Sequence, residues 1–109
     1  QNIITKDNNT SVDIRVIYEP CNKNHFGVIV KITIKCKYKN EETMLFLLEL
    51  EYFGLFKVDN IKNFNTNKLS TEGAKIIFPF ARAIIGNITQ NGGNMPIILE
   101  NVDFNQMKP

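Results

Sequence analysis

The sequence has few of the residues that most often carry out catalysis or bind metals. Its 109 residues include no tryptophan, two cysteines and a single histidine, His25. A Ser-His-Asp triad or a histidine-based metal site would depend on His25 alone. Gly92-Gly93 is not followed by Gly-Lys-Ser or Gly-Lys-Thr, so it does not match a phosphate-binding loop. We therefore expect a protein that is not an enzyme and that needs no metal or cofactor.

Long hydrophobic runs and a strong net charge are lacking too. No run approaches the ~20 apolar residues of a membrane-spanning helix, and no cleavable signal peptide is visible. The formal net charge of +2 is too small to indicate nucleic acid or a membrane surface by itself. Cys21 and Cys36 cannot form the disulfide framework of a small secreted domain. We expect a cytoplasmic protein with two reduced thiols, a bridge between them being the alternative, and no direct membrane insertion.

The first half of the chain alternates between apolar and polar residues, which is the pattern of half-buried strands. Residues 12–19, 26–38 and 43–58 follow this period, and the polar residues 39–42 predict a hairpin between the last two segments. Gly54 interrupts the third segment, as a bulge or bend would. Residues 1–10 are polar and form either a loose lead-in or the remnant of an edge strand. The pattern predicts an antiparallel sheet of three to four strands.

The second half switches to the helical period after a polar connector. Ser70 or Thr71 would cap the helix, Pro79 would kink or restart it, and Gly92-Gly93 would end it. The apolar stripe that should pack on the sheet consists of Ala74, Ile77, Phe78, Ala81, Ile84, Ile85 and Ile88. We predict one α+β domain over residues 1–109, in which one long kinked helix packs on one face of the sheet.

The predicted helix is apolar on a second face as well. Ile76, Phe80 and Ala83 lie nearly opposite the stripe that should pack on the sheet. A single sheet covers one face of a helix, so the second face needs either the C-terminal tail or another subunit. Between these two, we favour self-association through the helix.

The solvent side of the third strand carries a mixed pattern. Leu45 and Leu47 share a face with Glu49 and Glu51. Two neighbouring leucines beside two carboxylates indicate a contact site for a partner. Ordinary strand packing, with Lys–Glu pairs across the strands, explains the same pattern equally well.

A series of motifs along the chain resembles a known family. The motifs are, in order, Glu42-Thr43, Phe46-Leu47-Leu48-Glu49, Gly54-Leu55-Phe56, Phe78-Pro79-Phe80-Ala81-Arg82, Ile84-Ile85, Gly92-Gly93, Pro96, Ile98 and Val102-Asp103-Phe104. The similarity covers most of the chain, roughly Val12 to Met107. Together these motifs resemble the bacterial protein-export chaperone SecB.

The resemblance implies a fold, an assembly and partners. SecB-like proteins have a four-stranded antiparallel sheet backed by a long helix, and they form a tetramer that is a dimer of dimers. They bind unfolded precursor polypeptides without ATP and pass them to the translocase motor SecA. Leu47 and Glu49, with Leu45 beside them, match the SecA-docking surface. The opposite face of the strand matches the side packed in the tetramer and carries Leu48, Leu50 and Tyr52.

The chain also departs from the family pattern. The N-terminal strand is absent or reduced to residues 1–10, and the second helix and acidic tail expected after Phe104 are missing. These departures make a trimmed export chaperone the first expectation. A SecB-like chaperone dedicated to another client, such as an antitoxin, is the alternative.

A holdase also needs exposed apolar surface for its clients. We expect that surface around the glycine bend, the connector and the end of the helix, at Phe53, Leu55, Ile61, Phe64, Met95 and Ile97. Two rival functions are a purely structural oligomerisation module and a small nucleic-acid-binding sheet. The second would use a basic row of Lys31, Lys35, Lys37 and Lys39, but Phe26 and Tyr38 fall on the other face, so we predict no nucleic-acid partner.

Overall fold

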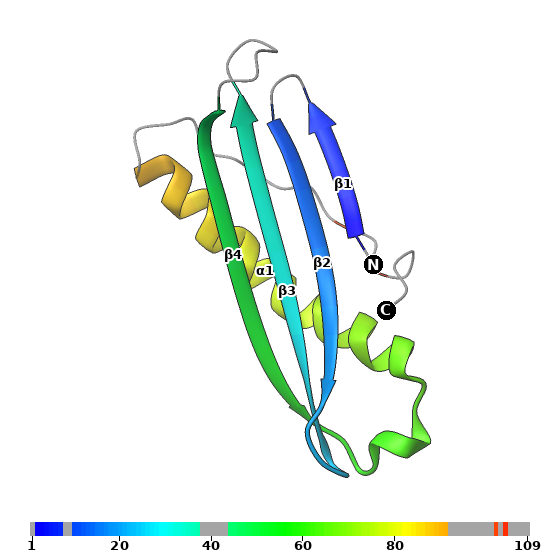
Figure 1. Ribbon diagram of the computed structural model, residues 1–109. Helices are drawn as coiled ribbons and strands as arrows, with labels where there is room; N and C mark the ends of the chain where they lie inside the picture. Colours follow the sequence, from blue (N-terminus) through cyan, green and yellow to red (C-terminus); the bar gives the residue numbers. More distant parts are fainter. Residues whose placement is uncertain (1, 8–9, 38–43, 92–101, 103, 105–109) are drawn as a thin grey trace.

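The computed structural model describes residues 2–7, 10–37, 44–91, 102 and 104, and shows a sheet covered on one face by a helix (Figure 1). The elements in chain order are β1 (Asn2–Asp7), β2 (Thr10–Pro20), β3 (His25–Lys37), β4 (Met44–Lys57), the 3-10 helix η1 (Ile61–Asn63) and α1 (Thr66–Asn91). The predicted α+β class is confirmed. The segment 1–10 contains an edge strand, β1, rather than a loose lead-in.

The sheet is an antiparallel meander in the order β1-β2-β3-β4. Strands β2 and β3 pair from Thr10 opposite Cys36 to Pro20 opposite Phe26. The pairing of β3 with β4 shifts register between Cys36 and Lys37, where β4 contains one extra residue, Leu45. Because each pairs with a single neighbour, β1 and β4 form the two edges of the sheet.

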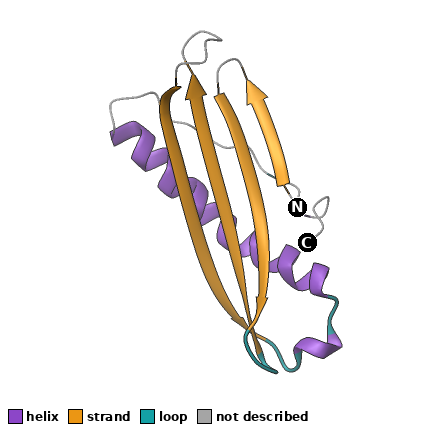
Figure 2. Ribbon diagram, in the orientation of Figure 1, coloured by secondary structure: helices purple, strands orange, loops and turns teal. Residues whose placement is uncertain are grey.

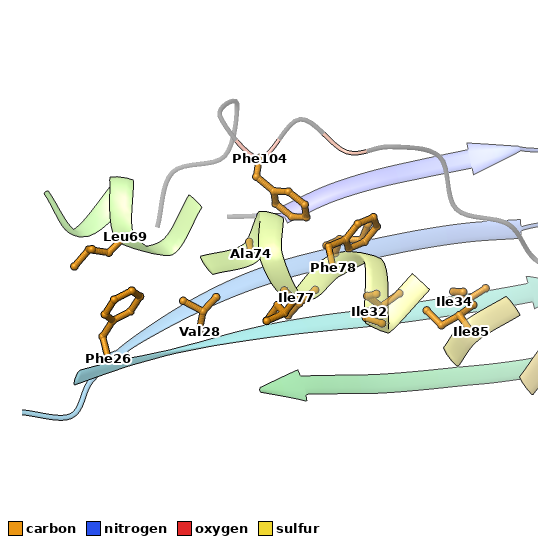
Figure 3. Packing of buried hydrophobic residues seen from close by; sticks show 13 residues of the cluster. Phe26, Val28, Ile32, Ile34, Leu69, Ala74, Ile77, Phe78, Ile85 and Phe104 are labelled. Carbon is orange, nitrogen blue, oxygen red and sulfur yellow. The ribbon is translucent and has the colours of Figure 1, made fainter. Parts of the chain in front are cut away.

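The core lies between the sheet and α1 (Figure 3). The period of two in β3 places alternate side chains under the helix, and Val28, Val30, Ile32 and Ile34 are fully buried there. Complete burial of such a side chain contributes about 1.5–3 kcal/mol. Most of the predicted helical stripe faces them, namely Ala74, Ile77, Phe78, Ala81 and Ile85.

The last residue of the predicted stripe, Ile88, is exposed. Figure 1 shows that α1 crosses the sheet obliquely. The neighbouring Thr89 is buried, so the buried side of the last helical turn carries Thr89 rather than Ile88.

Gly54 brings the helix and the sheet together. Of the two predicted alternatives, a bulge or a bend, it does not form the bulge. It stays in register opposite Val28. A Cβ at Gly54 would lie 2.7 Å from Cγ2 of Ile77, and a Cβ at Gly73 would lie 2.6 Å from Cγ2 of Val28. Both distances are below van der Waals contact, so these glycines permit the close approach of the two layers.

The helix begins about one turn before the predicted start at Ser70 or Thr71. Asn65 acts as the N-cap: its Oδ1 accepts a hydrogen bond from the amide of Asn67 at 2.7 Å, and its carbonyl accepts from the amide of Leu69 at 3.1 Å. Ser70 and Thr71 are buried inside the helix instead. Asparagine caps helices as well as serine does, and burial of Leu69 in the core favours the earlier start.

The helix continues through Pro79, so Pro79 does not restart it. Proline has no amide hydrogen to donate to the carbonyl four residues earlier, that of Lys75. Both Pro79 and Lys75 are exposed, so water can satisfy the carbonyl.

Candidate functional site

The face of β4 that points away from the helix carries the predicted partner-binding residues. Leu47 is 47% exposed, and Glu49 is exposed beside it. Leu45 lies at the register shift of β4, and its side chain is outside the described residues. The structure therefore brings Leu47 and Glu49 together on an accessible strand surface.

The two carboxylates of this face differ in their partners. Glu51 lies directly opposite Lys31, and its Oε1 is 3.1 Å from Nζ of Lys31. Glu49 lies opposite Thr33, and within the described residues it has no ion pair. The cross-strand packing explanation therefore holds for Glu51, while Glu49 remains available to a partner.

The other end of the same face is apolar. Phe53 is 52% exposed and Leu55 is 60% exposed. Across the strands Phe53 pairs with Ile29, and Ile29 pairs with Ile17, both half-buried. The Phe53 ring lies over Gly27, where a Cβ would be 2.6 Å from its Cε1. We call these four residues, Ile17, Ile29, Phe53 and Leu55, the outer apolar patch.

The remaining predicted client-binding residues are not gathered at this patch. Ile61 packs against the core, and Phe64 is exposed in the connector between η1 and α1. Met95 and Ile97 lie outside the described residues. In their place the structure adds Ile17 and Ile29, which the client-site prediction did not include. Their signal in the sequence was an apolar residue in the polar phase of an alternating strand.

Among the described elements, the sheet lies on only one side of α1 (Figure 2), and the second apolar face of the helix is exposed. Ile76 is 56% exposed and Phe80 is 58% exposed, and Ala83 is exposed beside them. The Phe80 ring stacks on Tyr52 of β4, with ring centroids 6.2 Å apart. This contact joins the helix face to the half-buried side chains along β4, which are Leu48, Leu50 and Tyr52.

The described residues of the C-terminal tail, Val102 and Phe104, do not cover this second face. Phe104 is buried and packs edge to face on Phe78, with ring centroids 5.2 Å apart (Figure 3). Thr71 Oγ1 also donates a hydrogen bond to the Phe104 carbonyl at 3.4 Å. Phe104 thus covers the side of the helix that carries Phe78, while Ile76 and Phe80 stay exposed to solvent.

The Phe78-to-Arg82 motif divides its side chains between the two faces of the helix. Phe78 and Ala81 are buried against the sheet, while Phe80 is more than half exposed and stacks on Tyr52. The Arg82 guanidinium lies 5.8 Å from the centre of the Phe78 ring, close enough for a cation–π contact. The motif therefore fixes the helix on the sheet and presents one aromatic ring outward.

Groups with catalytic potential are scattered in the described residues. His25 lies at the start of β3, with its Nδ1 2.9 Å from Oδ1 of Asn22. Cys21 and Cys36 are both free and lie near opposite ends of β3. The described part of the chain contains no group of three or more histidine, cysteine or acidic residues that could hold a metal ion. None of its helices combines the length and apolar character needed to cross a membrane.

Comparisons with known proteins give the relatives of this chain. The family model described as Preprotein translocase subunit SecB matches residues 1–108. Two similar curated proteins, each named Protein-export protein SecB, come from Roseobacter denitrificans (40% identical over 82 residues) and Cereibacter sphaeroides (43% identical over 75 residues). The matches cover 74% and 68% of this chain, but 49% and 45% of the relatives. The chain therefore spans about half the length of the curated relatives it matches.

Proposed function

The chain belongs to the SecB family, and on that basis we propose that it is an ATP-independent holdase that binds unfolded precursor polypeptides in the cytoplasm and delivers them to a SecA-type translocase motor. The proposed activity includes no catalytic step and no cofactor. The observation that carries the proposal is the apolar surface left uncovered on both sides of the fold, at Phe53 and Leu55 on the sheet and at Ile76 and Phe80 on the helix.

Client binding is assigned to the outer apolar patch. Unfolded segments gain about 25 cal/mol for each Å² of apolar surface they bury, minus the free energy needed to order a disordered chain. Each contact is therefore weak. Several patches on one assembly raise the effective concentration of the next client segment. Ile61, Phe64, Met95 and Ile97 remain predicted client contacts.

Docking of the motor is assigned to Leu47 and Glu49, with Leu45 as a neighbouring contact. An exposed leucine next to a carboxylate without an ion pair suits a partner that offers an apolar side chain and a basic group. The charge provides orientation and speeds association, while the leucine adds buried area.

Self-association is assigned to the open face of the helix and the adjoining face of β4. The contact residues in this proposal are Ile76, Phe80, Ala83, Leu48, Leu50 and Tyr52. A second copy that covers them would form a dimer, and a dimer of dimers would bring two helix layers between two sheets. The exposure of Ile76 and Phe80 in the single chain supports this assignment.

A nucleic-acid-binding sheet has less support. Lys31 of the basic row is paired with Glu51, and Glu49 and Glu51 lie on the same face of the sheet as Lys31 and Lys35. These carboxylates would repel phosphate groups.

The proposed function is tested by a refolding-delay assay without ATP. A slow-folding precursor polypeptide is diluted from denaturant with and without the purified chain. We expect refolding to stop at near-stoichiometric ratios, and an unrelated small α+β protein serves as the control. Refolding at the uninhibited rate would refute the holdase assignment. Arrest of one dedicated client but not of the precursor would favour a chaperone with a single client, such as an antitoxin.

A further inference from the structure

At one end of the sheet, hydrogen bonds connect the turn between β2 and β3 to the connector that follows β4. Here β2 turns into β3, and β4 leads into η1. The amide of Ile61 donates to the carbonyl of Lys23 at 2.8 Å, and the amide of Val58 donates to the carbonyl of Asn24 at 2.8 Å. The side-chain amide of Asn24 also donates to the carbonyls of Val58 and Asp59. The turn and the connector are therefore held in one arrangement.

A surface hollow of about 460 Å³ lies between this turn and η1, lined by Lys23, Asn60, Ile61 and Lys62. The Oδ1 of Asn60 accepts a hydrogen bond from the amide of Lys62 at 3.0 Å. This N-cap of η1 fixes the part of the lining that η1 supplies. Ile61 contributes an aliphatic side chain to the lining, which also contains two lysines, Lys23 and Lys62.

The lysines at this end of the sheet have no acidic partner within the described residues. The ion pairs found among the described residues include those of Arg15, Lys31 and Lys75. Lys57 pairs with His25 at the start of β3 and is also exposed. Asp59 is the neighbouring carboxylate, and no ion pair joins it to Lys23 or Lys62 in the described structure.

From this juxtaposition we propose that the hollow docks an acidic segment of a partner polypeptide. An apolar side chain of the segment enters against Ile61, and its flanking carboxylates meet Lys23 and Lys62. A peptide fits better than a nucleic acid, because the lining contains no aromatic side chain on which a base could stack. It also fits better than a membrane surface, because an apolar wall inside a hollow cannot insert into lipid. The site is separate from the outer apolar patch. It shares Ile61 with the predicted client contacts, but its two lysines play no part in the chaperone assignment.

The test is fluorescence anisotropy with a labelled synthetic peptide in which glutamates flank a leucine. We expect saturable binding to the full chain that weakens with salt. The double variant Lys23→Gln, Lys62→Gln should bind roughly fivefold more weakly or worse, because two exposed ion pairs are lost. Lys35→Gln is the matched control, since Lys35 is an exposed lysine without an ion pair in the described residues, and it should change the affinity less than about twofold.

Two further probes examine the apolar contact and the class of ligand. A peptide with glycine in place of leucine should bind more weakly, because the wall formed by Ile61 is then unused. Equal loss in the Lys35 control, or unchanged binding of the glycine peptide, would overturn the proposal. So would a single-stranded oligonucleotide that binds more tightly and depends on the same two lysines. Circular dichroism of each variant establishes that the fold is retained.

Discussion

Single residues on one face of β4 separate two kinds of surface. Leu47 and Glu49 lie at one end, and Phe53 and Leu55 lie at the other. A strand rises about 3.3 Å per residue, so Leu47 and Phe53 are about 20 Å apart. Two partners with different chemistry can therefore be tested by substitutions on a single strand.

The first residue-scale prediction concerns the two carboxylates. Glu49→Gln should weaken binding to a SecA-type motor about three- to tenfold, because its carboxylate is free to pair with a partner. Glu51→Gln should change it less than about twofold, since Glu51 is already paired with Lys31. Calorimetric titration at two salt concentrations measures both. An equal effect of the two substitutions would contradict the assignment.

The second prediction assigns two exposed leucines of β4 to different partners. Leu55→Ser should weaken client binding about five- to tenfold, through the loss of buried apolar area, and should leave motor binding unchanged. Leu47→Ser should do the reverse. Leu55 is preferred to Phe53 for this experiment because the Phe53 ring also covers Gly27. If both variants lose the same partner, the face of β4 is one site rather than two.

At the scale of elements, the hydrophobic periodicity of the sequence predicted the strands and the helix, but it did not predict the residues at which they begin and end. The period of two located β2, β3 and β4 because one face of each strand is buried and the other is exposed to solvent. Asn65, Ser70 and Thr71 are comparable N-caps, and only the burial of Leu69 distinguishes them. The spacing of Ile88 fits the buried stripe, but the structure buries Thr89 and leaves Ile88 exposed. Ile17 and Ile29 could be assigned to strands, whereas their meeting with Phe53 depends on register.

The element-scale prediction tests the observed helix start. Asn65→Ala should lower the free energy of unfolding by about 1 kcal/mol, because the amide of Asn67 loses its acceptor. Asn63→Ala is the control, since Asn63 is exposed in η1 and should stay within about 0.5 kcal/mol. Urea unfolding followed by circular dichroism gives both values. Equal stability of the two variants would mean that the helix is capped elsewhere.

At the scale of the whole molecule, the sheet has one face under the helix and one face in solvent, and the helix has one face on the sheet and one in solvent. Sequence periodicity predicted the two apolar faces of the helix. It did not predict that Phe104 covers the Phe78 side, because this contact joins residues far apart in the chain. The open face that remains contains Ile76, Phe80 and Ala83.

The whole-molecule prediction concerns assembly. Light scattering should show an oligomer for the chain and a smaller species for the double variant Ile76→Lys, Phe80→Lys. Both side chains are exposed in the single chain, so the fold should persist, whereas lysines buried at an interface are strongly unfavourable. Leu55→Ser, on the other face of the sheet, is the control and should keep the mass of the parent. A double variant with unchanged mass would place the interface elsewhere.

The central claim is that uncovered apolar surface binds unfolded polypeptide, and the heat capacity change of binding tests it most directly. A permanently unfolded client is titrated into the chain by calorimetry at several temperatures. The account predicts a negative heat capacity change, the marker of apolar burial, with an affinity that depends little on salt. Absence of binding, or a salt-sensitive affinity with a heat capacity change near zero, would contradict the claim.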